Sequence, residues 1–215
     1  MLPLVATALR VGAPVPDSVV VLFHGLGCDK SSLKSLAEGW AEQRPKTQFV
    51  LMQAQQASWR GGFDWLAFPR QRLEEETEAD YPAEVILPSV RRCQAEVSAA
   101  LDELLAELKL DDAMMVLAGF SQGAAVSAYT GLARGVAGVL PMGGPCPPRP
   151  QLLPEPAATK VCVISGSVDT SAPADQLVEV FKKYPGRVHI LPGVGHQVTK
   201  EHAQIGASFL AEVLG

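Results

Sequence analysis

Short apolar runs alternate along the chain with longer segments in which apolar residues recur at helical spacing. The short runs are rich in β-branched residues and are bounded by turns that contain glycine or proline, as strands buried on both faces are. This pattern predicts strands at 5–11, 19–23, 49–52, 113–118, 135–142, 161–164 and 188–191. It predicts helices from Ser31 or Ser32 to Gln43, at 83–108, directly after Gly123, at 172–183 and at 201–214.

The order of these elements predicts a mostly parallel sheet with helices on both faces. A chain of 215 residues fits one domain, so we assign 1–215 to a single α/β domain. Residues 53–82 lack a clear period but hold several aromatic residues, which is typical of a functional loop rather than of disorder. The long helix contains Pro88 near its start, so a helix that begins only at Pro88 is an alternative.

Composition narrows the class of protein. Hydrophobic residues make up 47% of the chain, charged residues 19%, and the net charge is −5, which describes a globular protein without the basic surface of a nucleic-acid binder. No apolar run approaches the ~18 residues of a transmembrane helix, and the apolar start lacks the positive charge of a signal peptide. The cysteines, which lack metal-ligand spacing, favour reduced thiols in a cytoplasmic protein; they are Cys28, Cys93, Cys146 and Cys162.

The segment Gly119-Phe120-Ser121-Gln122-Gly123 stands between a predicted strand and a run of small residues that begins a helix. Strand, Gly-x-Ser-x-Gly and helix together form the nucleophile elbow, a sharp turn that raises a serine above the sheet. The glycines permit backbone angles and close approaches that a Cβ would prevent. The alternative is an ordinary turn in which Ser121 caps the helix.

A serine nucleophile needs a base and a carboxylate that orients the base. In hydrolases with this elbow the order along the chain is Ser, then Asp or Glu, then His. Ser121, Asp169 and His196 have this order, and each follows the end of a predicted strand. Because parallel strands end at the same edge of a sheet, we expect these three side chains to meet there.

Each member of this set has an ordinary alternative. Asp169 also fits a turn or helix cap before Pro173, and His196 also fits a surface position in a glycine-rich turn. Other candidates for the acid and the base have less suitable positions, inside a helix or a strand: Asp175, His189 and His202.

An oxyanion hole in such a protein uses the backbone N–H of the residue after the nucleophile and a second N–H from an earlier loop. These are expected to be the N–H groups of Gln122 and Leu26. The second choice rests on Gly25 and Gly27, which allow the loop to bend. We expect His24 to hold this loop by hydrogen bonds and not to act as a base.

Together, these motifs resemble those of the acyl-protein thioesterase and small carboxylesterase family of lysophospholipase-like α/β-hydrolases. They are His24-Gly25-Leu26-Gly27, Gly119-Phe120-Ser121-Gln122-Gly123, the Asp169 turn and Gly193-Val194-Gly195-His196. The resemblance implies a single-domain α/β-hydrolase without a large lid, located in the cytoplasm and needing no metal or cofactor. It also implies ester or thioester substrates, including S-palmitoylated proteins, lysophospholipids and short acyl esters.

The irregular segment is the expected source of the acyl site. Four aromatic residues are predicted to line a groove for the acyl chain: Trp59, Phe63, Trp65 and Phe68. The alternative is that some of them are buried anchors of the loop. The closest match to the Trp-Phe-Asp element of the family is Gly62-Phe63-Asp64-Trp65, and Cys28 is inserted before Asp29. These differences leave both a general carboxylesterase and a protein depalmitoylase open.

The resulting hypothesis is a serine hydrolase that cleaves carboxylic esters or thioesters through an acyl-enzyme. Its expected partner is an acyl ester or thioester substrate, and a lipidated protein is one such substrate. Alternatives are a lysophospholipase, a lactonase of the dienelactone-hydrolase type, and a non-catalytic binding protein with a hydrolase fold. The lactonases typically use Cys where this chain has Ser121, and the binding proteins usually lack a member of the triad. An apolar rim around the site would allow a weak homodimer.

Overall fold

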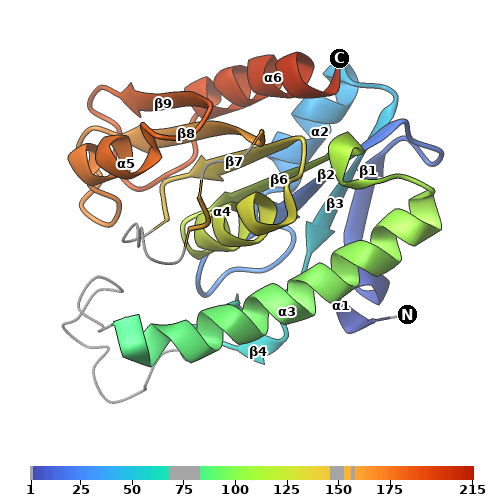
Figure 1. Cartoon of the computed structure of the whole chain (residues 1–215), viewed down its shortest axis with the longest axis horizontal. Helices are drawn as coiled ribbons and strands as arrows, with labels where there is room; N and C mark the ends of the chain where they lie inside the picture. Colours follow the sequence, from blue (N-terminus) through green and yellow to red (C-terminus); the bar gives the residue numbers. More distant parts are fainter. Residues whose placement is uncertain (1, 68–82, 146–152, 156–157) are drawn as a thin grey trace.

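A seven-stranded sheet forms the centre of the molecule in the computed structural model, which describes residues 2–67, 83–145, 153–155 and 158–215 (Figure 1). The strands lie in the order β1-β3-β2-β6-β7-β8-β9. Only β1 is antiparallel to its neighbour within this described sheet. The bounds are β1 Leu9–Gly12, β2 Ser18–Phe23, β3 Thr47–Met52, β6 Met115–Phe120, β7 Gly138–Met142, β8 Lys160–Gly166 and β9 Gly186–Leu191. The mostly parallel sheet expected from the sequence is confirmed.

Helices cover both faces of the sheet, as expected. In Figure 1, α2 and α6 lie above the sheet and α3 lies below it, on the same side as α4 and α5. The bounds are α1 Pro3–Ala6, α2 Lys34–Gln43, α3 Ala83–Leu108, α4 Gln122–Arg134, α5 Ala174–Phe181 and α6 Lys200–Leu214, with a short 3₁₀ turn at Asp112–Met114. Among the described residues, none of these helices combines the length and the apolar character needed to cross a bilayer.

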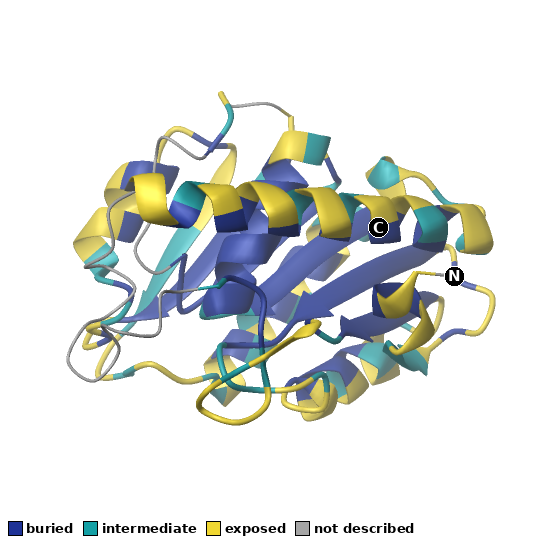
Figure 2. Ribbon diagram, turned by 90° about the horizontal axis from the view of Figure 1, so that it is seen from below, coloured by how far each residue is buried: buried dark blue, intermediate teal, exposed yellow. Residues whose placement is uncertain are grey.

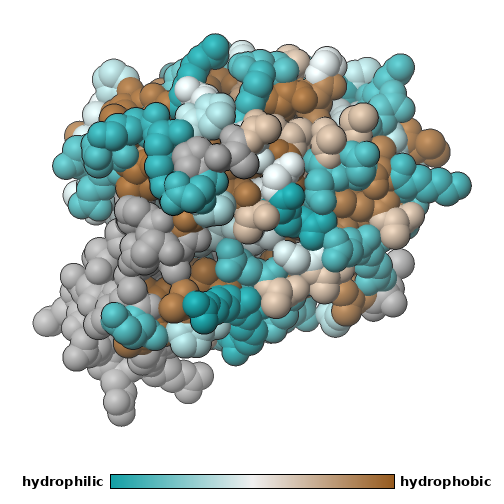
Figure 3. Space-filling view, in the orientation of Figure 1, coloured by the Kyte–Doolittle hydropathy of each residue, from teal (hydrophilic) through white to brown (hydrophobic). Residues whose placement is uncertain are grey.

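The central strands are buried on both faces. Along β2, Val19, Val21 and Phe23 pack toward α3 and α4, whereas Val20 and Leu22 pack toward α2 and α6. Figure 2 shows these strands in dark blue between partly exposed helices. The edge strand β9 is half-buried to exposed, and hydrophilic and hydrophobic side chains are interspersed on the outer face seen in Figure 3. The core is therefore two apolar layers, one on each side of the sheet.

The expected strand at 5–11 is partly wrong. Residues Pro3–Ala6 form the single turn α1, and the strand begins only at Leu9. Proline is favoured in the first turn of a helix, and Leu4 and Val5 are buried in the core layer that contains α3. Tertiary burial therefore converts an apolar, strand-like run into a helical turn.

Two further element starts differ from expectation, whereas the start of α3 is as expected. Neither Ser31 nor Ser32 caps α2, because the carboxylate of Asp29 accepts the Ser31 N–H at 2.7 Å in a turn and the helix begins at Lys34. Helix α3 begins at Ala83 with Pro88 inside it, so the alternative start at Pro88 is wrong. Strand β7 begins at Gly138, because Gly135 ends α4 in the left-handed conformation.

The segment predicted as irregular contains a short hairpin. Strands β4 (Gln56–Ala57) and β5 (Phe63–Asp64) pair antiparallel near the carboxyl ends of the central strands. The turn between them lies directly on the loop after β2, because a Cβ on Gly62 would overlap the carbonyl groups of Gly27 and Cys28. Residues 68–82 of the predicted loop lie outside the described residues.

Candidate active site

Ser121 lies in the sharp turn between β6 and α4. Its backbone has φ 56° and ψ −118°, a conformation that is costly for a residue with a Cβ. The turn is held by close packing, since a Cβ on Gly123 would overlap the carbonyl oxygen of Phe23 and a Cβ on Gly119 would overlap that of Gly123. The Ser121 N–H also donates to Met142 O at 2.9 Å. The side chain makes no capping bond to α4, so its hydroxyl is available for other partners.

A chain of hydrogen bonds joins the three polar side chains that were expected to meet. His196 Nε2 lies 2.9 Å from Ser121 Oγ, and His196 Nδ1 lies 2.8 Å from Asp169 Oδ2. The carboxylate of Asp169 is fully buried, whereas the His196 side chain is 30% exposed. This is the geometry in which an imidazole can take a proton from the serine while the carboxylate fixes its tautomer.

Asp169 combines both roles that the sequence allowed. Its Oδ1 accepts the N–H groups of Ser171 and Ala172 at 2.9 Å and 3.1 Å, so it does organise the turn before α5. Its other oxygen faces His196. The backbone bonds orient the carboxylate, and they help to offset the cost of burying its charge.

The packing of His196 on Phe120 was not foreseen from the sequence. The two ring centroids are 4.8 Å apart, and a Cβ on Gly143 would stand 2.8 Å from the Phe120 ring. Phe120 is the second residue of the elbow motif, so its position beside Ser121 was the available signal. It packs on one face of the imidazole and limits where the ring can lie.

The other candidates for base and acid lie elsewhere. His189 lies in β9, opposite Ile164 of β8. His202 accepts the N–H of Thr199 through its Nδ1 at 3.2 Å. Asp175 is exposed in the first turn of α5. The structure therefore brings His196 and Asp169 to Ser121 and leaves these three apart from it.

The loop after β2 passes beside the nucleophile. A Cβ on Gly25 would stand 3.5 Å from the Cβ of Ser121. Leu26 follows in this loop, and among the described residues its N–H has no hydrogen-bond partner. The N–H of Gln122 lies on the other side, in the first turn of α4, where the helix dipole favours negative charge. Both N–H groups expected for an oxyanion hole thus belong to segments next to Ser121.

His24 is buried and makes hydrogen bonds within the loop region. Its Nδ1–H donates to Gly25 O at 2.8 Å, and its Nε2 accepts the Ala54 N–H at 3.2 Å. Burial lowers the pKa of the His24 imidazole, although the Gly25 carbonyl opposes that effect. A neutral, fully bonded imidazole agrees with the expected structural role.

The four aromatic residues predicted to line an acyl groove differ in burial. Trp59 is 49% exposed at the tip of the hairpin, and Phe63 is half-buried in β5. Trp65 is only 6% exposed, and its indole N–H donates to His24 O at 3.0 Å. Phe68 lies outside the described residues. Trp65 therefore fits the buried-anchor alternative.

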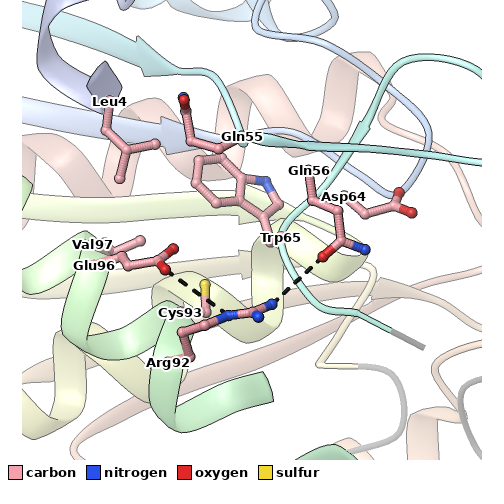
Figure 4. A pocket seen from close by; sticks show the side chains of 9 residues that line it. All are labelled: Leu4, Gln55, Gln56, Asp64, Trp65, Arg92, Cys93, Glu96 and Val97. Carbon is pink, nitrogen blue, oxygen red and sulfur yellow. Dashed lines mark hydrogen bonds and ion pairs between the residues drawn. The ribbon is translucent and has the colours of Figure 1, made fainter. Parts of the chain in front are cut away.

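A small cavity of about 240 Å³ is lined in part by Trp65 and lies between the hairpin, α1 and α3 (Figure 4). In Figure 4, Arg92 on α3 reaches Gln56 and Glu96, and the thiol of Cys93 lies nearby. The guanidinium is thus already engaged by partners on both sides.

The three cysteines in the described part of the chain have raised thiol pKa values. Burial raises the pKa of Cys28, which is half-buried beside the nucleophile loop, and raises that of both Cys93 and Cys162 to about 12. Among the described residues, no three His, Cys, Asp or Glu side chains are grouped so that they could hold a metal ion. A thiol that stays protonated near neutral pH is a weak nucleophile.

The fold and the serine turn define an α/β-hydrolase, and comparison with known proteins gives the family. The model of the phospholipase/carboxylesterase family matches residues 10–214, so the chain belongs to that family and is a carboxylesterase-type hydrolase. This confirms the family expected from the motifs.

Solved structures with the same fold agree with this assignment. The chain is similar to the esterase PE8 at 26% identity, with a TM-score of 0.82 and coverage of 96% of this chain and 98% of that one. It also resembles a carboxylesterase from Mesorhizobium loti, at 21% identity and TM-score 0.74 over 94% and 92% of the two chains. Arabidopsis thaliana SOBER1 matches at 17% identity and TM-score 0.75 over 92% and 99%. The last two matches show the fold.

Proposed function

We propose that the protein is a serine hydrolase that cleaves carboxylic ester or thioester bonds through an acyl-enzyme, with Ser121 as nucleophile, His196 as base and Asp169 as orienting acid. The observation that carries the proposal is the continuous chain from Ser121 Oγ through His196 to the buried carboxylate of Asp169, with links of 2.9 Å and 2.8 Å. The strained backbone of Ser121 at the start of α4 adds support, because residues in such conformations cluster at active sites.

In the first half-reaction, Ser121 Oγ attacks the acyl carbonyl and His196 Nε2 takes the hydroxyl proton. The negative charge that develops on the carbonyl oxygen is bound by the N–H groups of Gln122 and Leu26. The tetrahedral intermediate collapses, and His196 returns its proton to the departing alcohol or thiol. The product of this step is an acyl ester of Ser121.

In the second half-reaction, water takes the place of the leaving group. His196 removes a proton from the water as it attacks the acyl carbon, and the same N–H groups bind the second oxyanion. Collapse releases the carboxylic acid and returns the proton to Ser121. Asp169 stays ionised throughout and stabilises the imidazolium that forms in each step.

The acyl chain and the leaving group stay predictions. The hydrophobic and half-exposed positions of Trp59 and Phe63 near the loop after β2 support a groove for an acyl chain. A lipidated protein or a lysophospholipid as substrate, a cytoplasmic location and a weak homodimer also stay predictions. The binding-protein alternative is disfavoured because the proposed triad is complete and hydrogen-bonded.

The proposal is tested with p-nitrophenyl esters from acetate to palmitate and with an acyl thioester. We expect turnover by the wild type and a loss of roughly 10³-fold or more in kcat for Ser121→Ala. Ser127→Ala is the matched control, because Ser127 lies on the same helix and its hydroxyl donates to Ala124 O at 2.9 Å. That variant should keep wild-type activity.

Labelling with a fluorophosphonate separates the enzyme from the binding-protein alternative. The wild type and Ser127→Ala should label, and Ser121→Ala should not. A wild type that hydrolyses no ester or thioester and takes no label would sink the hydrolase proposal.

A further inference from the structure

The direction of the Leu26 N–H is fixed by the peptide group to which it belongs. That group also contains the carbonyl of Gly25, which accepts His24 Nδ1–H at 2.8 Å and the Cys28 N–H at 3.2 Å. A trans peptide is planar, with its C=O and N–H pointing in opposite directions. Two hydrogen bonds to the Gly25 oxygen therefore constrain where the Leu26 N–H points.

The next peptide group is held from outside the loop, by β5. The Gly27 N–H donates to both the carboxylate Oδ1 of Asp64 at 2.9 Å and the carbonyl of Phe63 at 3.1 Å. The Phe63 N–H in turn donates to Cys28 O at 2.9 Å. The loop is thus bonded to β5 on both sides of Gly27, a residue with φ +69°.

Strand β5 is itself tied to the nucleophile helix. The side-chain oxygen of Gln122 accepts the N–H groups of Trp65 and Leu66 at 2.6 Å and 3.2 Å. Residues 63–66 therefore connect the loop that carries Leu26 with the residue that follows Ser121. The two proposed oxyanion donors share one hydrogen-bonded support.

Asp64 is the unusual member of this support. It is 6% exposed, and no ion pair joins it to a Lys or Arg within the described parts of the chain. In Figure 4 its carboxylate points away from Trp65 and Arg92. Burying an unpaired carboxylate is costly, and its hydrogen bond to the Gly27 N–H is charge-assisted and strong.

We propose that Asp64 is a positioning residue for the Leu26 N–H; this rests on the proposed function. By accepting the Gly27 N–H, Asp64 holds the Leu26–Gly27 peptide, and this constrains the adjacent Gly25–Leu26 peptide, whose N–H serves the oxyanion site. The role is geometric and not electrostatic. A negative carboxylate near a developing oxyanion opposes the charge, so any benefit comes from the direction of the hydrogen bond. An amide oxygen at the same place should serve as well.

The kinetic test compares Asp64→Ala and Asp64→Asn with the wild type on p-nitrophenyl butyrate. Asp64→Ala should lower kcat by roughly 10- to 100-fold with little change in KM, because a displaced donor acts only in the transition state. Asp64→Asn should recover most of that loss, since its amide oxygen can accept the Gly27 N–H. Asp29→Asn is the control that removes a nearby charge while it keeps the turn at Ser31.

Equal losses in Asp64→Asn and Asp64→Ala, or an unchanged kcat in Asp64→Ala, would overturn the proposal. Failure of the hydrolase proposal looks different, because the wild type would then lack both turnover and fluorophosphonate labelling.

A second measurement does not depend on turnover. Amide hydrogen exchange by NMR should show the Gly27 N–H exchanging at least about tenfold faster in Asp64→Ala than in the wild type or Asp29→Asn, with Asp64→Asn close to the wild type. If Asp64→Ala does not fold, Asp64→Ser gives the same comparison, because its hydroxyl is too short to replace the carboxylate. Unchanged exchange at Gly27 in the variant that folds contradicts the proposal.

Discussion

The two halves of the proposed triad are held in different ways. Ser121 follows β6, a strand buried between β2 and β7, and its turn is fixed by backbone contacts that leave no room for a Cβ at Gly119 or Gly123. His196 follows the edge strand β9, which is half-buried to exposed, in a glycine turn where a Cβ on Gly195 would meet nothing within 4 Å. The turn of the nucleophile is fixed by packing at both of its own glycines, whereas the turn of the base packs on Gly166 through the Val194 carbonyl and is otherwise held by hydrogen bonds and the Phe120 ring.

We therefore expect substitutions in the two regions to differ in whether they lower the stability of the fold or the catalytic rate. A side chain added at Gly123 of the central turn must displace backbone of β2, so it should affect folding first. A change at the β8 and β9 edge removes a hydrogen bond or a loop contact, so it should affect catalysis first. Substitutions on the two sides can test that separation.

The largest effect is expected at the edge, for Asp169→Asn. The amide keeps the shape and can accept the backbone N–H groups, but it favours the wrong tautomer of His196. We expect kcat to fall by roughly 10³- to 10⁴-fold, with little change in the unfolding midpoint. Asp175→Asn, on the exposed first turn of α5, is the matched control and should retain wild-type kcat. The reverse pattern would assign the acid to Asp175.

On the central side, Gly123→Ala should damage the fold. The new Cβ would overlap the carbonyl oxygen of Phe23 on β2, and neither backbone segment can move without disturbing the sheet. We expect the free energy of unfolding in urea to fall by about 3 kcal/mol or more. Gly195→Ala has open space and should stay within about 0.5 kcal/mol of the wild type. Equal stability of the two variants would remove the distinction between the two regions.

Stability should also fall with acidification. Burial lowers the pKa of both His24, beside the central turn, and His202, on the edge side, below the ordinary value of about 6.5. The unfolded chain then binds protons first, so stability is fully present above pH ~6.5 and is lost as pH falls below it. Each histidine adds a slope of at most about 1.4 kcal/mol per pH unit.

Urea denaturation between pH 5 and 8 measures this slope. His24→Gln and His202→Gln should each flatten it, because each removes one group whose protonation opposes the fold. A slope that is the same in the wild type and in both variants would contradict the assignment to these side chains.

Sequence alone was sufficient where local chemistry and periodicity agree. The β-branched runs give the buried strands, and the Gly-x-Ser-x-Gly turn requires its neighbours to be small. The meeting of Ser121, Asp169 and His196 follows from their places after parallel strands, because such strands end at one edge of the sheet. These features follow from local patterns and from the general geometry of parallel sheets.

Features that depend on distant contacts could not be predicted in this way. The turn α1 forms because Leu4 and Val5 reach the core layer of α3, and a local pattern does not contain that contact. Asp64 reads as an ordinary polar residue in Phe-Asp-Trp, since its partner, Gly27, lies 37 residues earlier. The aromatic residues of 53–82 also looked equivalent, although their burial differs widely.

The smallest effects should distinguish those aromatic residues. Trp65→Phe removes the indole bond to His24 O in a buried site, so we expect a loss of about 1–3 kcal/mol in unfolding free energy and an unchanged preference for acyl-chain length. Trp59→Ala, at the exposed tip beside Arg60, should change stability by less than about 0.5 kcal/mol. If Trp59 contacts the acyl chain, this variant should lose activity on p-nitrophenyl palmitate while it keeps activity on the acetate. A shift in chain-length preference for Trp65→Phe instead would place the buried indole in the groove and would make the loop anchor part of the substrate site.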